Sequence, residues 1–220
     1  MEFNIAHKPE YAWLTVRIPA GQTLNVEASA MATMDTNIEM KTRVKGGFRR
    51  FLSRESLFIN EFTARGGSGE IAIAPGPMGD VGHFEVKNTN FYISSASYVA
   101  HTQGLNYETK FQGVLGGFFS GAGLFLVRMS GSGHVWFNSY GALVEVDVED
   151  DYIVDNGHIV AFTEGLEYDI QKLGGYKSLF FSGEGLVCRF RGRGKIWMQT
   201  KKPAALVAWA DAFRPVQKSN

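Results

Sequence analysis

The chain has 220 residues, of which 45% are hydrophobic and 20% charged, a balance typical of a folded globular protein and not of a disordered one. Its 22 basic and 22 acidic residues cancel, so the whole molecule has no general attraction for nucleic acid or acidic lipid. The single cysteine, Cys188, excludes an intramolecular disulfide and a cysteine-built zinc site. No secretory leader is readable at the start, and we expect a cytoplasmic protein.

Strand patterns begin near the N-terminus. Leu14, Val16 and Ile18 alternate with polar residues, which predicts a strand with one face toward water. Farther along, residues 41–54 contain basic residues, no acid, and interleaved aromatic side chains. This pattern suits single-stranded nucleic acid or an acidic lipid surface, but a solvated face is the simpler interpretation.

The centre and the C-terminal part of the chain contain matching blocks in the same order. The blocks are residues 104–108 with 165–169, 118–124 with 180–186, and 131–136 with 192–197. A fainter copy precedes them and ends near residue 71. This repetition predicts three degenerate strand-rich units, which we call the first, second and third units, over residues 14–74, 84–138 and 143–200.

Helical signals appear only at the end of the chain. Pro203 can start a helix, and Leu206, Trp209 and Phe213 fall on one face of it. Residues 111–127 carry no charge but contain five glycines, which argues against a membrane-spanning helix there.

We therefore predict a single all-β domain over residues 1–220. The three units are expected to form a pseudo-threefold barrel or sandwich, and residues 201–220 a short helix and tail.

The runs 155–162 and 183–200 carry a family resemblance. They resemble an uncharacterised, mostly prokaryotic family whose mitochondrial member is named for altered inheritance of mitochondria. The resemblance implies a fold similar to the tryptophan RNA-binding attenuator protein, with three units in one chain. It implies no catalytic residue, because the family has no established activity. The first unit departs most, since residues 70–73 include no aromatic where Trp136 and Trp197 stand in the other units.

No constellation of residues indicates an enzyme. The five histidines, His7, His83, His101, His134 and His158, stand at no metal-ligand spacing, and structural roles are favoured for them. The Gly-x-Gly pairs lead into strand-like runs, whereas a phosphate-binding loop must open a helix. The lone cysteine is interpreted as a core thiol. We therefore predict no catalytic, cofactor-binding or metal-binding residue.

A basic strand is predicted in the third unit. Arg189, Arg191, Arg193 and Lys195 alternate with other residues, so one strand would place all four on the same face. Such a face could bind nucleic acid or another anion. The alternative is a solvated face whose charge is offset by the acids of residues 145–149.

Each unit contains two adjacent glycines followed by an aromatic residue, which we call the tips. The tip aromatics are Phe48, Phe118, Phe119 and Tyr176. Large apolar side chains in loops require a cover, which would be a second copy, another protein or peripheral contact with a membrane; alternatively the tips plug the ends of the fold. We favour a non-enzymatic binding or scaffold domain that self-associates through the tips. Nucleic-acid or anion binding is the second interpretation and an enzyme without a readable site the third.

Overall fold

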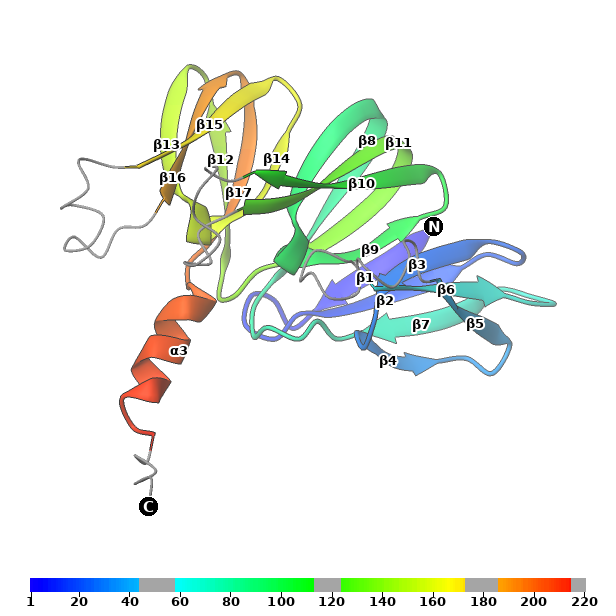
Figure 1. Cartoon of the computed structure of the whole chain (residues 1–220). Coiled ribbons are helices and arrows are strands. Elements are labelled where there is room, and N and C mark those ends of the chain that lie inside the picture. The colour runs from blue at the N-terminus through cyan, green and yellow to red at the C-terminus, as the bar shows by residue number, and fades with distance from the viewer. Residues whose placement is uncertain (44–57, 113–123, 173–185, 215–220) are drawn as a thin grey trace.

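The computed structural model describes residues 1–43, 58–112, 124–172 and 186–214 (Figure 1). Antiparallel strands make up most of this part of the chain. Its one α-helix, α3 (Pro203–Asp211), follows the last strand. The prediction of a single strand-rich domain with a short C-terminal helix is therefore confirmed.

The strands follow one another closely along the chain. In and before the first unit they are β1 (Glu2–Ala6), β2 (Trp13–Ile18), β3 (Thr23–Glu27), β4 (Met31–Met34), β5 (Ile38–Arg43), β6 (Ile59–Ala64) and β7 (Gly69–Ile73). The next stretch has β8 (Val81–Ser94), the 3-10 turn η1 (Ser95–Ser97), β9 (Tyr98–Thr102), β10 (Leu105–Gln112) and β11 (Leu124–Asn138). The last has β12 (Leu143–Val148), β13 (Asp151–Asp155), η2 (Asn156–His158), β14 (Ile159–Thr163), β15 (Leu166–Lys172), β16 (Leu186–Gly192) and β17 (Gly194–Gln199).

The described strands form three sheets. A four-stranded sheet has the order β1-β2-β7-β4, and a three-stranded sheet has the order β13-β16-β15. The largest has ten strands in the order β12-β17-β14-β8-β11-β9-β3-β6-β5, with β10 paired to β11. Among the described strands no sheet closes on itself, so the barrel alternative is wrong and the sheets are open. The pseudo-threefold arrangement and the likeness to the attenuator protein stay predictions.

The ten-stranded sheet crosses between units at two places, which we call the junctions. At the first junction β3 pairs with β9, and at the second β8 pairs with β14. Both pairings are antiparallel. The backbone hydrogen bonds of the sheet therefore run continuously from the first unit to the third.

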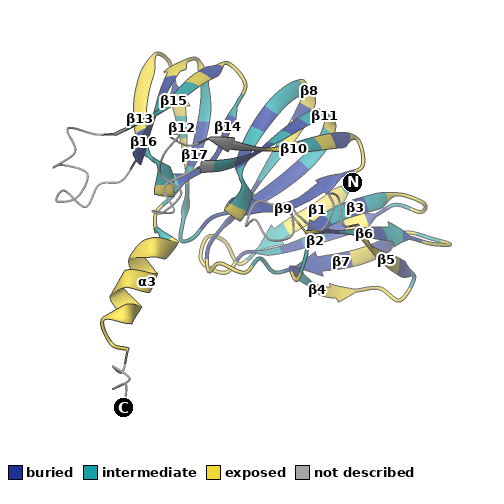
Figure 2. Cartoon of the chain, viewed as in Figure 1, coloured by how far each residue is buried: buried dark blue, intermediate teal, exposed yellow. Residues whose placement is uncertain are grey.

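Buried residues lie along the strands (Figure 2), and their hydrophobic side chains form the core. Leu14, Val16 and Ile18 of β2 are all fully buried, which confirms the alternation predicted for them. Trp136 and Trp197 are buried at corresponding points of β11 and β17, and the Trp197 ring lies 5.5 Å from that of Phe91. Each such side chain contributes roughly 1.5–3 kcal/mol when it is removed from water.

Candidate functional site

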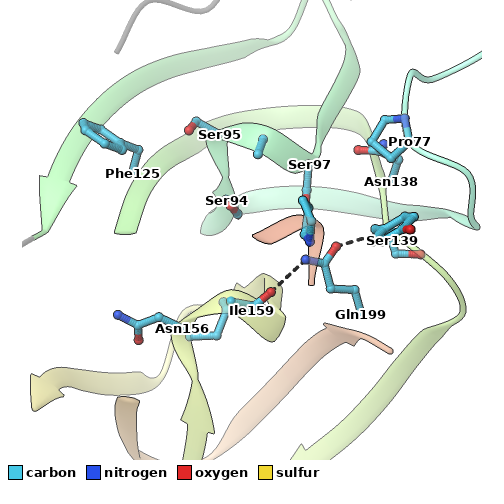
Figure 3. Close-up of a pocket in the computed structure, with 14 residues that line it drawn as sticks. Pro77, Ser94, Ser95, Ser97, Phe125, Asn138, Ser139, Asn156, Ile159 and Gln199 are labelled. Atoms are coloured by element: carbon cyan, nitrogen blue, oxygen red, sulfur yellow. Dashed lines mark hydrogen bonds between the residues drawn. The ribbon is translucent and has the colours of Figure 1, made fainter. Parts of the chain in front are cut away.

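A pocket of about 280 Å³ lies where residues of the second and third units meet (Figure 3). The ends of β8, β11 and β17 and the turns η1 and η2 all contribute to its wall. No lining residue carries a charge; they are Pro77, Ser94, Ser95, Ala96, Ser97, Phe125, Asn138, Ser139, Tyr140, Asn156, Gly157, Ile159, Gln199 and Pro203.

Three side-chain amides, those of Asn138, Asn156 and Gln199, line the pocket together with several hydroxyl groups. Gln199 is held by two hydrogen bonds, in which its Nε2 donates to the carbonyl of Gly157 at 2.8 Å and its Oε1 accepts from the N–H of Tyr140 at 2.9 Å (Figure 3). Asn138 is only 2% exposed, and its Oδ1 has no hydrogen-bond partner among the described residues. The side-chain amide of Asn156 is likewise without a partner there. Because a buried polar atom is costly unless it is hydrogen-bonded, the unpartnered amide atoms of Asn138 and Asn156 suit a compact neutral polar molecule.

The predicted basic strand is divided between two sheets. β16 ends at Gly192, whose φ of +106° favours glycine, and β17 begins at Gly194. β16 pairs with β13 and β15, whereas β17 pairs with β12 and β14. The four basic residues therefore do not share the face of one straight strand, because the chain changes sheets between Arg191 and Lys195.

Acidic neighbours offset two of these four charges. Arg189 Nε lies 2.8 and 2.9 Å from the two carboxylate oxygens of Asp151, and this hydrogen bonding lowers the pKa of Asp151. Lys195 forms ion pairs with Glu145 and, at 3.1 Å, with Asp147. Arg191 and Arg193 are exposed, and neither has an ion pair within 4.0 Å among the described residues, although Arg191 lies opposite Asp151 and contributes to lowering its pKa. The anion-binding hypothesis therefore depends on these two arginines.

The tip residues Phe48, Phe118, Phe119 and Tyr176 lie outside the described residues. The strands that flank them are described, and in each unit they are antiparallel neighbours. The pairs that precede and follow the tips are Arg43 with Ile59, Gln112 with Leu124, and Lys172 with Leu186.

Two histidines that are far apart in the sequence meet across β8 and β11. His83 Nε2 lies 3.0 Å from His134 Nδ1, and the Phe3 ring lies 4.4 Å from that of His83. Burial, helped by the neighbouring His134, lowers the pKa of His83 to about 4. Sequence spacing could not reveal this pair, because only the β8–β11 register brings the two rings together. In the described part of the chain, no group of three or more His, Cys, Asp or Glu side chains could hold a metal ion.

Three other titratable groups are strongly affected by burial. Burial raises the pKa of Glu27, the last residue of β3, to about 7. It raises the pKa of Cys188 to about 12, so this thiol is protonated at neutral pH. Burial also raises the pKa of Tyr98, whose hydroxyl lies 2.6 Å from Nδ1 of His101. None of these groups lines the pocket.

The helix α3 projects from the strand-rich body and is exposed along its length (Figures 1 and 2). No residue of it is buried: Leu206 is 42% exposed, Val207 66% and Trp209 64%. The rings of Trp209 and Phe213 lie 5.2 Å apart, as the predicted common face requires. Within the described residues, no helix has the length and apolar character needed to cross a membrane.

Comparisons with known proteins place the chain among uncharacterised relatives. A family model described as "Mitochondrial biogenesis AIM24" matches residues 3–201. An uncharacterised protein of Streptococcus pyogenes serotype M6 is 25% identical over 213 residues, which cover 91% of this chain and 86% of the relative. A crystal structure of a Streptococcus pyogenes protein superposes with a TM-score of 0.83 at 24% identity and covers 97% of this chain and 99% of that one, a likeness of fold alone.

Proposed function

Because this chain belongs to the mitochondrial biogenesis AIM24 family, as residues 155–162 and 183–200 indicated, and because its relatives named above are uncharacterised, we propose a function from its own surfaces. The protein is a non-enzymatic scaffold that binds a second copy of itself. One observation carries this proposal, the uncovered apolar helix α3.

The residues of α3 are of the apolar kind normally found in a helix that is buried by other parts of a protein or by a membrane. Apart from Pro203 and Asp211, its residues are alanine, leucine, valine and tryptophan, yet none is buried. A helix that is apolar all round is normally enclosed by protein or membrane. Contiguous exposed apolar side chains of this kind mark contact sites. A second copy is the simplest cover, because the tips would add Phe48, Phe118, Phe119 and Tyr176 to the same self-association.

Serine substitution on α3 tests the scaffold. In Leu206→Ser with Trp209→Ser, we expect the particle mass measured by light scattering to fall while the melting temperature changes little, because exposed positions seldom affect folding by more than about 0.5 kcal/mol. The matched control, Ala204→Ser with Ala208→Ser, keeps the large side chains and should keep the mass. The same measurement on Phe48→Ser, Phe118→Ser and Phe119→Ser tests the tips. A lower mass would indicate an interface, whereas a lower melting temperature at unchanged mass would indicate that the tips plug the ends of the fold.

A protein that is monomeric at high micromolar concentration would overturn self-association. Flotation with vesicles of acidic and of neutral lipid then separates membrane contact from a foreign protein partner. We place the scaffold in the cytoplasm, a compartment with which its one buried free thiol is compatible.

Binding of a small neutral polar molecule in the pocket is a second candidate function, favoured by the unpartnered Oδ1 of the buried Asn138. A thermal-shift screen with compact amides and polyols tests it. We expect stabilisation by a binder to disappear in Asn138→Leu and to persist in Ser95→Ala, since Ser95 lines the pocket but is only partly buried. If no neutral compound shifts the wild-type melting temperature, this candidate is wrong.

A further inference from the structure

Strand pairings within the three units recur three times, but the pairing between units occurs only twice. For example, the pairings of β2 with β7, of β8 with β11 and of β12 with β17 follow the same plan. The junctions, β3 with β9 and β8 with β14, join the first unit to the second and the second to the third. A third pairing of this kind would join β13 of the third unit to β4 of the first. Among the described strands, however, β13 pairs with β16 and β4 with β7, and each leaves its other edge free.

The two junctions share one register. In each, the next-to-last residue of the first strand pairs with the residue that follows a β-bulge in the second strand. Val26 pairs with Ala100 in this way, and Ile93 pairs with Ala161. A bulge at the same place in both partner strands makes the register a repeated feature of the fold.

The free strands have the same two landmarks. β4 has its bulge between Met31 and Thr33, so Thr33 follows the bulge. The next-to-last residue of β13 is Val154. The register of the junctions would therefore pair Val154 with Thr33 and, one step along, Ile153 with Met34.

Burial distinguishes the paired strands from the free ones. Every residue of β9 is buried, and β14 is buried except at its last residue. No residue of β4 is buried. At the free edges Met34 is 39% exposed and Ile153 is 51% exposed.

The central pair of the second junction indicates what Met34 and Ile153 can do. There Tyr92 of β8 lies opposite Phe162 of β14, and their rings stack with centroids 4.9 Å apart. Ile153 and Met34 occupy the corresponding positions and are also large and apolar. Exposed apolar strand edges readily pair with another chain.

We propose that β13 of one copy pairs antiparallel with β4 of the next copy, with Ile153 opposite Met34, and so continues the sheet from chain to chain. This rests on the proposed self-association and names a surface for it that is distinct from α3 and the tips. The contact joins two different strand edges, and the described part of each chain has one free β13 edge and one free β4 edge. Copies therefore add head to tail, into a ring if the rotation closes and into a filament if it does not.

Mixing two edge variants tests the proposal. Met34→Lys blocks pairing at the β4 edge and Ile153→Lys blocks pairing at the β13 edge, because a lysine at a strand edge opposes pairing. Where the edge is the contact that holds the copies together, each variant alone should sediment as a single chain. An equimolar mixture should form a two-chain particle and nothing larger, because only β13 of the first variant and β4 of the second remain competent. Full wild-type mass in both single variants would overturn the proposal.

Cross-linking tests the register. Opposed residues of antiparallel strands have Cα atoms about 4.5–5.5 Å apart, within the range that a disulfide spans. Met34→Cys mixed with Ile153→Cys should give a covalent two-chain product under oxidation, whereas neither variant alone should. Thr33→Cys with Ile153→Cys is the matched control, because neighbouring strand residues point to opposite faces. Equal yields in the two mixtures would overturn the register.

The edge contact and the general scaffold fail in distinguishable ways. If the wild-type protein is monomeric at high micromolar concentration, both are wrong. If it is oligomeric and the lysine variants keep its mass, only the edge contact is wrong, and α3 or the tips hold the copies together. If the lysine variants dissociate it while the α3 serine variant does not, the edges alone are sufficient.

Discussion

A strand in the middle of the ten-stranded sheet and an edge strand of the four-stranded sheet are similar in kind but opposite in burial. β9 has the sequence YVAHT and is fully buried, whereas β4 has the sequence MATM and contains no buried residue. Both are short, rich in small and apolar residues, and bulged at the same place. The difference therefore comes from the neighbour, since β9 has β3 beside it and β4 has no second described strand. Strand composition alone does not determine whether a strand is covered.

The largest expected effect is on the free energy of unfolding, when one charged residue is placed in the buried strand β9 and, for comparison, in the exposed strand β4. Ala100 of β9 is fully buried and lies at the first junction, so Ala100→Asp should cost about 3 kcal/mol or more of the free energy of unfolding, because an unpaired buried charge is strongly destabilising. Thr33→Asp, at the corresponding free position, should cost about 0.5 kcal/mol or less. Urea unfolding at low protein concentration measures both. Equal losses would mean that β4 is covered within the single chain.

A smaller effect is expected at the last residues of β3 and β13. Burial raises the pKa of Glu27 to about 7, so the folded state binds a proton more tightly than the unfolded state does. Stability should therefore fall as the pH rises from about 4.5 to 7. Glu27→Gln should be about 1–3 kcal/mol more stable than the wild type at pH 8, with the advantage vanishing near pH 4.

Asp155 ends β13 and provides the contrast. It forms an ion pair with Lys202 at 3.0 Å, and its Oδ1 accepts a hydrogen bond from the N–H of Gly157 at 2.7 Å. Asp155→Asn should therefore lower stability at pH 8, the reverse of the effect at Glu27. Thermal melts of both variants at pH 4, 6 and 8 would settle the signs, and stabilisation in both would contradict this account.

The smallest expected effect concerns Arg191 and Arg193. We expect no binding of single-stranded nucleic acid at about 50 mM salt, where phosphate contacts still contribute strongly, because acids offset the charges of Arg189 and Lys195. Arg191→Glu with Arg193→Glu should leave the melting temperature unchanged. Fluorescence anisotropy of a labelled oligonucleotide provides the measurement. Wild-type binding that this double variant abolishes would restore the nucleic-acid hypothesis.

Local patterns predicted local structure well. The alternation at Leu14, Val16 and Ile18 required only that one face of a strand meet the core, and the burial of β2 agrees. Pro203 and the spacing of Trp209 and Phe213 predicted α3 for a similar reason, because helix geometry is set by a few adjacent turns.

Features that depend on register and chain path were not predictable. The alternation at Arg189 and Lys195 indicated one strand, but the left-handed backbone at Gly192 passes the chain from one sheet to another. The contact of His83 with His134 depends on a pairing across two long strands. The barrel alternative rested on repetition alone, and repetition does not determine whether the last unit meets the first.

Alkylation of Cys188 can measure the local opening of the three-stranded sheet that contains it. Cys188 is fully buried in β16, opposite Val154 on one side and Ile170 on the other. A thiol that is buried and protonated at neutral pH does not react with alkylating reagents until these neighbours separate. Because the chain has no other cysteine, the rate of alkylation counts openings of this three-stranded sheet without any engineered label.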